Sequence, residues 1–306
     1  MAPLLTKHTI VQTDGTELPY IAWLPDARPR AAIIALHGFN DYSGAFVKPG
    51  AYWAARGIAT YAYDQRGFGG GPHKKIWAGH ETMVDDLITT SQLIRSLHPD
   101  TPIFVLGESM GGAVAMIADA GRRLHVEGLI LAAPALRGRK YIGTIPSLML
   151  DIAFRLVPGW RLTGRSLRIQ ASDNIPMLRR LNADPMVIKG TRIDTLKGLV
   201  DTMDVAIAAA AQLNTRTFTL YGGHDELVPR CPILDAILAM PRDRSHRSAV
   251  YPAGWHMLLR DLKAQIVMDD ILGWISDPTA PLPSGAGQAS EMARHVDRST
   301  CSPPNR

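Results

Sequence analysis

Apolar residues in the first half of the chain come in short continuous runs, and between these runs apolar positions recur with a helical period. A continuous run is typical of a strand buried on both faces, as in a parallel sheet. The pattern predicts strands at 9–12, 20–24, 31–36, 58–63, 103–106 and 128–132. It predicts helices around 45–56, 81–97 and 110–122. The alternation of strand and helix indicates a parallel sheet covered on both sides, and Asp14-Gly15 predicts a hairpin that begins it with an antiparallel edge.

From residue 137 to 212 this rhythm stops, because no β-like run occurs and prolines interrupt helical pieces. We expect this segment, called the cap below, to be a helical subdomain inserted after the sixth strand. The rhythm then resumes with strands at 217–221 and 249–251 and a closing helix at 262–275. The chain is therefore predicted to be an α/β protein with a mostly parallel, eight-stranded sheet flanked by helices. Residues 1–136 and 213–276 form its core, and the Pro-, Gly- and Ser-rich residues 277–306 form a disordered tail.

Composition agrees with a folded protein, since 46% of the 306 residues are hydrophobic and 20% are charged. Two cysteines are too few for a disulfide framework, and neither a secretory signal nor an apolar run of membrane-spanning length is present. We therefore expect a cytoplasmic protein. The net charge of +5 is not gathered into a stripe and no nucleic-acid-binding motif accompanies it, so nucleic acid is not an expected partner.

The pentapeptide Gly107-Glu108-Ser109-Met110-Gly111 directly follows an apolar strand and directly precedes a helix. Such a G-x-S-x-G sequence arises by chance in about one chain in nine of this composition, so the context matters more than the motif. Between a strand and a helix it predicts a sharp, strained turn that lifts a serine hydroxyl above the sheet, with glycines where side chains would collide. Ser109 is thus a candidate nucleophile.

A serine nucleophile needs a base, and the base needs an acid that fixes its tautomer. Asp225 lies in a loop after the strand at 217–221, and His256 lies in the loop after the strand at 249–251. The carboxyl ends of parallel strands meet at one edge of the sheet, so both loops can reach Ser109. Glu226 competes with Asp225 for the acid role, and His224 is the neighbouring alternative for the base. His246 precedes its strand and is expected at the wrong end of the sheet.

Two backbone N–H groups are candidates for an oxyanion hole. One belongs to Met110, at the start of a helix, and the other to Phe39, in the loop after the strand at 31–36. An ordinary glycine turn would explain the sequence around Phe39 equally well. The glycines after Asp64 and Arg66 lack dinucleotide-binding spacing, and those two residues are expected to order nearby loops. No metal-ligand spacing is present, so neither a metal nor a cofactor is predicted.

At this point the chain resembles the serine hydrolases of the α/β-hydrolase fold, specifically the monoglyceride lipase and lysophospholipase group. The resemblance covers about residues 11–275 and rests on LHGFNDYSGAF, YDQRGFG, LGESMGGAVA, YGGHDELVP and GWHMLLR. It implies Ser109, Asp225 and His256 as the triad, Phe39 and Met110 as oxyanion donors, and a helical cap. Two departures concern the substrate: Glu108 stands where such lipases often carry His, and HGFNDYS replaces HGxGEHS.

The cap holds 12 Lys and Arg against 6 Asp and Glu, so the rest of the chain is slightly negative. Apolar residues of its segment 144–160 are candidates for the substrate mouth, resting peripherally on an anionic membrane: Ile145, Leu148, Met149 and Ile152. A helix packed on the core with solvated arginines is the alternative. We expect an esterase of the EC 3.1.1 type that cleaves monoacylglycerol or lysophospholipid through an acyl-enzyme, with activity falling below about pH 6 to 7.

Other activities remain open for the same residues. A short-chain carboxylesterase, a thioesterase and a cofactor-free perhydrolase would use the same triad. A prolyl aminopeptidase would need acids of the cap to hold the substrate amine, for which Asp173, Asp184, Asp194, Asp201 and Asp204 are available. A ligand receptor on a hydrolase scaffold is less expected, since a receptor does not need all three triad residues.

Overall fold

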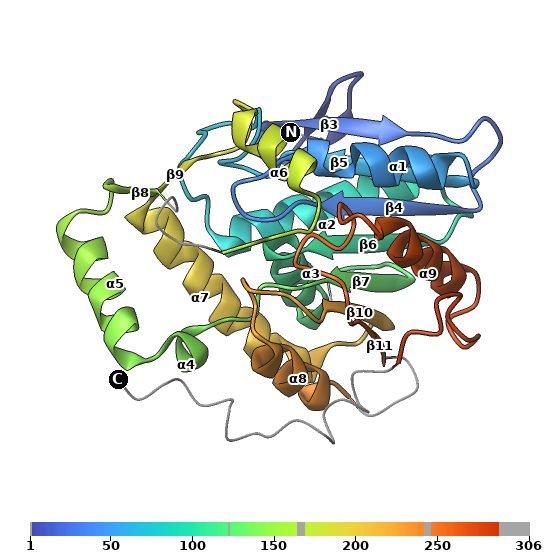
Figure 1. Ribbon diagram of the computed structural model, residues 1–306. Coiled ribbons are helices and arrows are strands. Elements are labelled where there is room, and N and C mark those ends of the chain that lie inside the picture. Colours follow the sequence, from blue (N-terminus) through green and yellow to red (C-terminus); the bar gives the residue numbers. More distant parts are fainter. Residues whose placement is uncertain (1, 122, 164–168, 242–245, 288–306) are drawn as a thin grey trace.

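The computed structural model describes residues 2–121, 123–163, 169–241 and 246–287. In these residues one large sheet is covered by helices on both faces (Figure 1). Across the sheet the nine strands are β1 (Leu4–Leu5), β2 (Thr9–Val11), β3 (Glu17–Trp23), β5 (Ile58–Tyr63), β4 (Ala31–Leu36), β6 (Ile103–Glu108), β7 (Gly128–Ala132), β10 (Thr217–Gly222) and β11 (His246–Tyr251). The pairs from β1 to β5 are antiparallel, and those from β5 to β11 are parallel. The predicted fold class and its antiparallel edge are confirmed.

The helices divide between the two faces and the cap. The described chain contains η1 (Ser43–Phe46), α1 (Val47–Ala54), α2 (His80–Leu97), α3 (Met110–Ala120), α4 (Arg139–Ile142), α5 (Thr144–Leu156), α6 (Ile175–Ala183), α7 (Ile193–Ala209), η3 (Ala210–Gln212), α8 (Arg230–Ala239) and α9 (Ala264–Ser276). Helices α1 and α9 pack on one face of the sheet, and α2, α3 and α8 pack on the other.

The central strand β4 illustrates why the sheet is buried on both sides. Its alternate residues point to opposite faces, so Ile34 and Leu36 join the core beneath α2 and α3 while Ile33 joins Trp53 and Trp274 beneath α1 and α9. All these side chains are inaccessible to solvent or nearly so, and each large one stabilises the fold by about 1.5–3 kcal/mol. Because both faces are buried, the pairing of β4 with β5 and β6 has one register. This register determines where each of these strands ends at the edge of the sheet.

The sheet has nine strands rather than the predicted eight. The additional strand, β1, has two residues and pairs with β2, and a run this short leaves no detectable pattern. The expectation of a cap without strands is also wrong, since β8 (Arg161–Thr163) pairs antiparallel with β9 (Gly190–Arg192). Both are three residues long and each residue of β8 is exposed, so they lack the apolar run from which buried strands are recognised.

Most of the cap lies outside the core, but its last helix does not. Helix α7 packs between α3 and α5 (Figure 1), and its Leu199 and Ala206 belong to the main core. Helix α5 therefore lies outside α7 and presents an apolar surface to solvent. None of the helices in the described ranges is long and apolar enough to cross a membrane.

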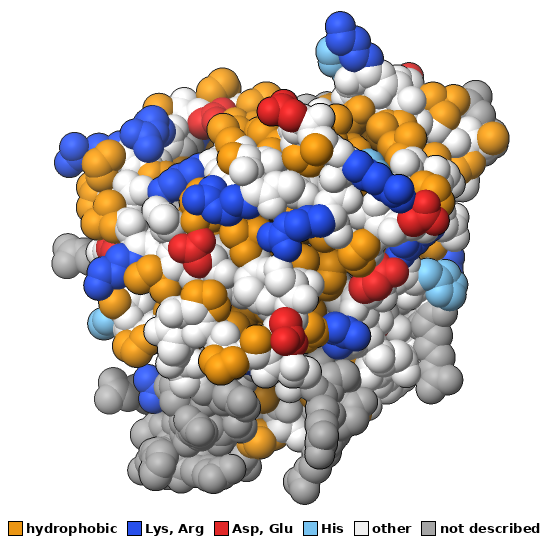
Figure 2. All heavy atoms as spheres, turned by 90° about the vertical axis from the view of Figure 1, so that its right-hand side faces the viewer, with side chains coloured by type: hydrophobic (Ala, Val, Ile, Leu, Met, Phe, Trp, Pro, Cys, Tyr) orange, Lys and Arg blue, Asp and Glu red, His pale blue; other side chains and the backbone are white. Residues whose placement is uncertain are grey.

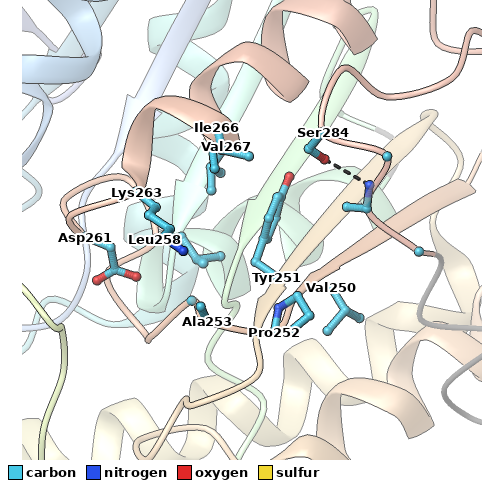
Figure 3. A pocket seen from close by; sticks show the side chains of 14 residues that line it. Val250, Tyr251, Pro252, Ala253, Leu258, Asp261, Lys263, Ile266, Val267 and Ser284 are labelled. Atoms are coloured by element: carbon cyan, nitrogen blue, oxygen red, sulfur yellow. Dashed lines mark hydrogen bonds between the residues drawn. The ribbon is translucent and has the colours of Figure 1, made fainter.

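The C-terminal segment contradicts the predicted disorder as far as residue 287. Val250 N donates to the carbonyl of Gly287 at 3.1 Å, and Ser284 N donates to Asp270 Oδ1 at 2.9 Å. Figure 3 shows Ser284 beside Tyr251, with its hydroxyl accepting from Ala286 N, at the rim of a cavity of about 390 Å³. Hydrogen bonds to a buried acid of α9 thus hold this part of the chain. Residues 288–306, including Cys301, lie outside the described residues.

On the face drawn in Figure 2, Lys and Arg side chains are intermixed with fewer Asp and Glu side chains, and apolar atoms lie between them. On this face no extended patch of one sign is visible among the described residues.

Candidate active site

Ser109 stands on a strained turn between β6 and α3, the nucleophile elbow (residues 107–111). Its φ is +52° and its ψ is −112°, in a region that non-glycine residues rarely adopt and that often marks a functional site. A Cβ at Gly107 would overlap the backbone of Gly111 and Gly112, and a Cβ at Gly111 would overlap the backbone of Leu36. The two glycines therefore let strand and helix approach closely enough to form this turn.

The acid and base predicted from the sequence lie together. His256 Nδ1 is 2.7 Å from Asp225 Oδ2, and both side chains are buried. The other oxygen, Asp225 Oδ1, accepts the backbone N–H groups of Leu227 and Val228, each at 2.9 Å. An ionised carboxylate only accepts hydrogen bonds, so Nδ1 carries the ring hydrogen and donates it. The lone pair is then on Nε2, where a general base needs it.

The competing residues are engaged elsewhere. Glu226 Oε2 accepts the backbone N–H of Gln170 at 2.7 Å. The ring of His224 stacks on Trp255, with centroids 5.3 Å apart. His246 is the first residue of β11, at the opposite end of that strand from the loop of His256. The geometry thus favours the Asp225–His256 pair over each alternative.

The loop after β4 lies against the elbow. A Cβ at Gly38 would be 3.4 Å from Ser109 Cβ. Residues 38–41, called the oxyanion turn below, are closed by a hydrogen bond from Asp41 N to Gly38 O at 3.3 Å, with Asn40 at φ +64°. A positive φ at the third position is typical of a type II turn, where Asn is favoured. Phe39 occupies the second position, and Met110 begins α3, whose first N–H groups have no partner within the helix.

His37, for which the sequence predicted no role, is hydrogen-bonded to the oxyanion turn. Its Nδ1 donates to the carbonyl of Gly38 at 2.8 Å, and its Nε2 accepts the N–H of Gln65 at 3.0 Å. Complete burial lowers the pKa of His37 and keeps the ring neutral, as this donor–acceptor pattern requires. The histidine therefore orders the turn rather than transferring a proton.

The glycine-rich loop after β5 folds around a carboxylate. Asp64 accepts the backbone N–H groups of Ser43 at 2.8 Å and Gly70 at 2.7 Å. Arg66 donates to both Asp86 and Asp14, and these hydrogen bonds raise the pKa of the guanidinium. The loop thus connects β5 to the start of the chain. Within the described ranges, no three His, Cys, Asp or Glu side chains are grouped so as to bind a metal.

The loop that carries His256, residues 252–263, is called the histidine loop below, and the cap is attached to it. Met257 N donates to the carbonyl of Ala171 at 3.0 Å. Ser172 Oγ donates to Asp261 Oδ1 at 2.6 Å. In contrast, the predicted substrate residues lie on the outer side of α5, where 49–65% of each residue's surface is exposed: Ile145, Leu148, Met149 and Ile152. Thus residues 171–172, rather than α5, contact the loop of the candidate base.

The fold, with a strained serine directly after strand β6, is that of an α/β-hydrolase. Residues 27–263 match the family described as serine aminopeptidase, S33, and the chain belongs to this family. It is 25% identical over 275 residues to a monoacylglycerol lipase of Mycolicibacterium smegmatis, covering 88% of this chain and 96% of the relative. It is 26% identical over 285 residues to the monoglyceride lipase of Mus musculus, covering 91% of this chain and 92% of the relative.

Solved structures show the same fold. A monoacylglycerol lipase from Paleococcus ferrophilus matches with a TM-score of 0.70 at 19% identity, over 85% of this chain and 98% of that one. A soluble variant of monoglyceride lipase from Saccharomyces cerevisiae matches with a TM-score of 0.75 at 15% identity, over 90% and 98%. The family match and the sequence relatives place the chain among serine hydrolases of the lipase and esterase kind.

Proposed function

We propose that the protein hydrolyses carboxylic esters of single-chain lipids, monoacylglycerol or lysophospholipid, through an acyl-enzyme on Ser109. His256 Nε2 takes the hydroxyl proton as Oγ bonds to the acyl carbon. The proton then passes to the leaving alcohol as the ester bond breaks. Water, deprotonated by the same nitrogen, attacks the acyl-enzyme and releases the fatty acid and free Ser109. The observation that carries the proposal is the buried Asp225–His256 pair, which leaves Nε2 as the acceptor.

The proposed oxyanion donors are the backbone N–H groups of Phe39 and Met110. In the tetrahedral intermediate the carbonyl oxygen becomes negative, and fixed donors stabilise it without reorganising. Gly38 lies against Ser109, so the next amide along the oxyanion turn is close to the reacting atoms. Met110 adds the positive end of the α3 dipole, which favours the same charge.

The lipid substrate is supported by the exposed surface of α5. Five apolar residues recur at helical spacing along one side of this helix and are 49–74% exposed: Ile145, Leu148, Met149, Ile152 and Leu156. Arg155 and Arg161 are exposed beside them. An apolar stripe with neighbouring arginines suits peripheral contact with an anionic lipid surface, from which a single-chain ester would be taken. The names of the lipase relatives agree with this substrate class.

Aminopeptidase activity, which the family's description names, finds less support. It would require an acid of the cap that is available to a substrate ammonium group. Each candidate acid already accepts hydrogen bonds: Asp173 from Leu262 N, Asp184 from Tyr42 Oη, Asp194 from Arg192, Asp201 from Lys197 and Arg139, and Asp204 from Arg139. An incoming ammonium group would therefore have to share these carboxylates with the donors that they already have.

The test is a rate comparison over p-nitrophenyl esters from two to sixteen carbons, beside monoacylglycerol, lysophosphatidylcholine and a proline p-nitroanilide. We expect the single-chain lipids and long esters to react fastest, and Ser109→Ala to abolish both turnover and labelling by a fluorophosphonate. A preference for the two-carbon ester, or turnover of the anilide alone, would overturn the lipid assignment. Labelling that persists in Ser109→Ala would place the nucleophile elsewhere.

Membrane contact through α5 is tested separately. Leu148 and Leu156 are 58% and 74% exposed, so changing both to Ser should leave the fold intact. Losing two leucines from the interface should weaken co-sedimentation with anionic vesicles by at least about tenfold. Leu24→Ser is the matched control, because Leu24 is 57% exposed and lies outside the cap. Equal vesicle binding by both variants would contradict the proposed contact.

A further inference from the structure

Three charged side chains that the proposed mechanism does not use lie buried beside the candidate site. Arg260 donates from Nη1 to Asp41 Oδ2 at 2.7 Å and from Nη2 to Glu108 Oε1 at 2.9 Å. Their exposed side-chain fractions are 10% for Arg260, 7% for Asp41 and 2% for Glu108. Burying three charges is costly unless they are paired, so a cluster of this kind needs a reason for its place.

Each member of this cluster belongs to a different part of the candidate site. Glu108 directly precedes Ser109 in the nucleophile elbow. Asp41 closes the oxyanion turn through the hydrogen bond from its N–H to Gly38 O, and its Oδ1 accepts the N–H of Tyr42 at 2.9 Å. Arg260 lies four residues after His256, and its N–H donates to Met257 O at 2.8 Å. One guanidinium thus connects the elbow, the oxyanion turn and the histidine loop.

We propose that Arg260 is a positioning residue that holds the oxyanion turn and the nucleophile elbow in register with the histidine loop. This inference rests on the proposed function, because it concerns the geometry of that reaction. The planar fork of an arginine can hold two carboxylates at a fixed separation, which the single ammonium of a lysine cannot do. The separation that Arg260 sets is that between the turn bearing Phe39 and the elbow bearing Ser109 and Met110.

Electrostatics support a fixed rather than a mobile bridge. Burial disfavours the charged guanidinium, but the attraction of Glu108 and Asp41 outweighs burial and raises the pKa of Arg260 above its usual value. Among the described residues, Glu108 Oε2 has no hydrogen-bond partner. The other oxygen, Oε1, accepts from Arg260, so the guanidinium is the charged partner of this buried carboxylate. Loss of the guanidinium would leave the buried carboxylates of Glu108 and Asp41 without their charged partner, which favours either proton uptake or a shift of the elbow or the turn.

The test compares Arg260→Met and Arg260→Lys with the wild type and with Arg95→Met as a matched control. Arg95 Nη2 donates to both carboxylate oxygens of Glu127 at 2.8 Å, and Glu127 accepts the N–H of Ile103, the first residue of β6, at the opposite end of that strand from the elbow. We expect Arg260→Met to lower kcat on p-nitrophenyl butyrate by about 10²-fold with KM nearly unchanged, the effect of a misplacement of about 1 Å. Arg260→Lys should recover part of this loss, and Arg95→Met should stay within about twofold of wild type.

A second measurement separates positioning from general damage to the fold. A trifluoromethyl ketone forms a tetrahedral adduct with the serine and places an oxyanion in the hole, so its affinity should fall in parallel with kcat. All variants are compared well below their melting temperatures. If Arg260→Met does not fold, Asp41→Asn and Glu108→Gln each remove one charge of the bridge and should give the same parallel loss.

The outcomes distinguish the two proposals. An active wild type with folded Arg260 variants as active as Arg95→Met would overturn the positioning role alone. A fall in kcat with unchanged affinity for the trifluoromethyl ketone would also overturn it, because the oxyanion site would then be intact. A wild type without turnover and without fluorophosphonate labelling would overturn the proposed function and the positioning role together.

Discussion

Replacing Asp225 by asparagine exchanges one oxygen of the candidate acid for an NH₂ group and tests directly how the tautomer of His256 is fixed. In the native chain Asp225 Oδ1 accepts two backbone N–H groups and Oδ2 accepts the hydrogen on His256 Nδ1. An asparagine keeps the first two bonds with its carbonyl oxygen. Its NH₂ group then faces Nδ1, which must become the acceptor. The ring hydrogen moves to Nε2, and His256 can no longer take a proton from Ser109.

The expected loss follows from that exchange. An enzyme held in the wrong tautomer loses about 10⁴-fold in kcat, which corresponds to about 5 kcal/mol of activation free energy. The fold should be almost unaffected, because both bonds to Leu227 and Val228 persist. Stability and activity should therefore separate: the unfolding free energy changes by less than about 1 kcal/mol while turnover nearly vanishes.

The assay is steady-state hydrolysis of p-nitrophenyl butyrate near pH 8, with urea denaturation of the same preparations. Glu226→Gln is the control, since Glu226 Oε2 accepts the N–H of Gln170 and an amide oxygen does this equally well. We expect that variant to stay within about threefold of wild type. The reasoning is refuted if Asp225→Asn retains more than about a tenth of the activity, or if Glu226→Gln loses as much.

Two further predictions concern stability. Gly111→Ala should destabilise the protein by about 3 kcal/mol or more, because its Cβ would overlap the backbone of Leu36. Gly15→Ala meets no atom within 4 Å and should cost only the left-handed backbone strain of about 1–2 kcal/mol; similar melting temperatures for the two variants would contradict this. Burial raises the pKa of Asp261 to about 6 from the ordinary 3.8, so the folded state holds this proton more tightly than the unfolded chain. Ionisation of Asp261 is therefore less favourable in the folded state, and the free energy of unfolding falls as pH rises from about 4 to above 6. Asparagine does not ionise, so Asp261→Asn lacks this fall. The variant should gain up to about 3 kcal/mol relative to wild type between pH 4 and 7, and urea denaturation showing a constant difference would disprove it.

The elbow and the strands could be predicted because their signals are local. Gly107, Ser109 and Gly111 lie within five positions, and the steric reason for each glycine is contained in the turn itself. The strand from 31 to 36 is equally local, since six consecutive apolar residues describe burial on both faces. Where the signal was too short, as for the two residues of β1, the prediction missed the strand.

The acid and base were harder to identify, because a loop of known position still offers several polar residues. The sequence favoured Asp225 but left Glu226 as a competitor, and the structure distinguishes them through their hydrogen-bond partners, His256 and Gln170. Nothing in the spacing of neighbouring residues determines which carboxylate turns inward. That choice depends on the backbone N–H groups of Leu227 and Val228, which only the folded loop brings to one oxygen.

The bridge of Arg260 could not be found from the sequence, and the reason is physical. Its partners, Asp41 and Glu108, lie 219 and 152 positions away along the chain. In the sequence each is an acidic residue of the kind common on protein surfaces, with no sign that it is buried. Glu108 drew notice only as a departure from the histidine common in related lipases. The fold gives it a partner, because β4 and β6 are neighbours in the sheet and the histidine loop follows β11 at the same edge. Glu108, which directly precedes the candidate nucleophile, is therefore connected to the oxyanion turn by a single buried arginine.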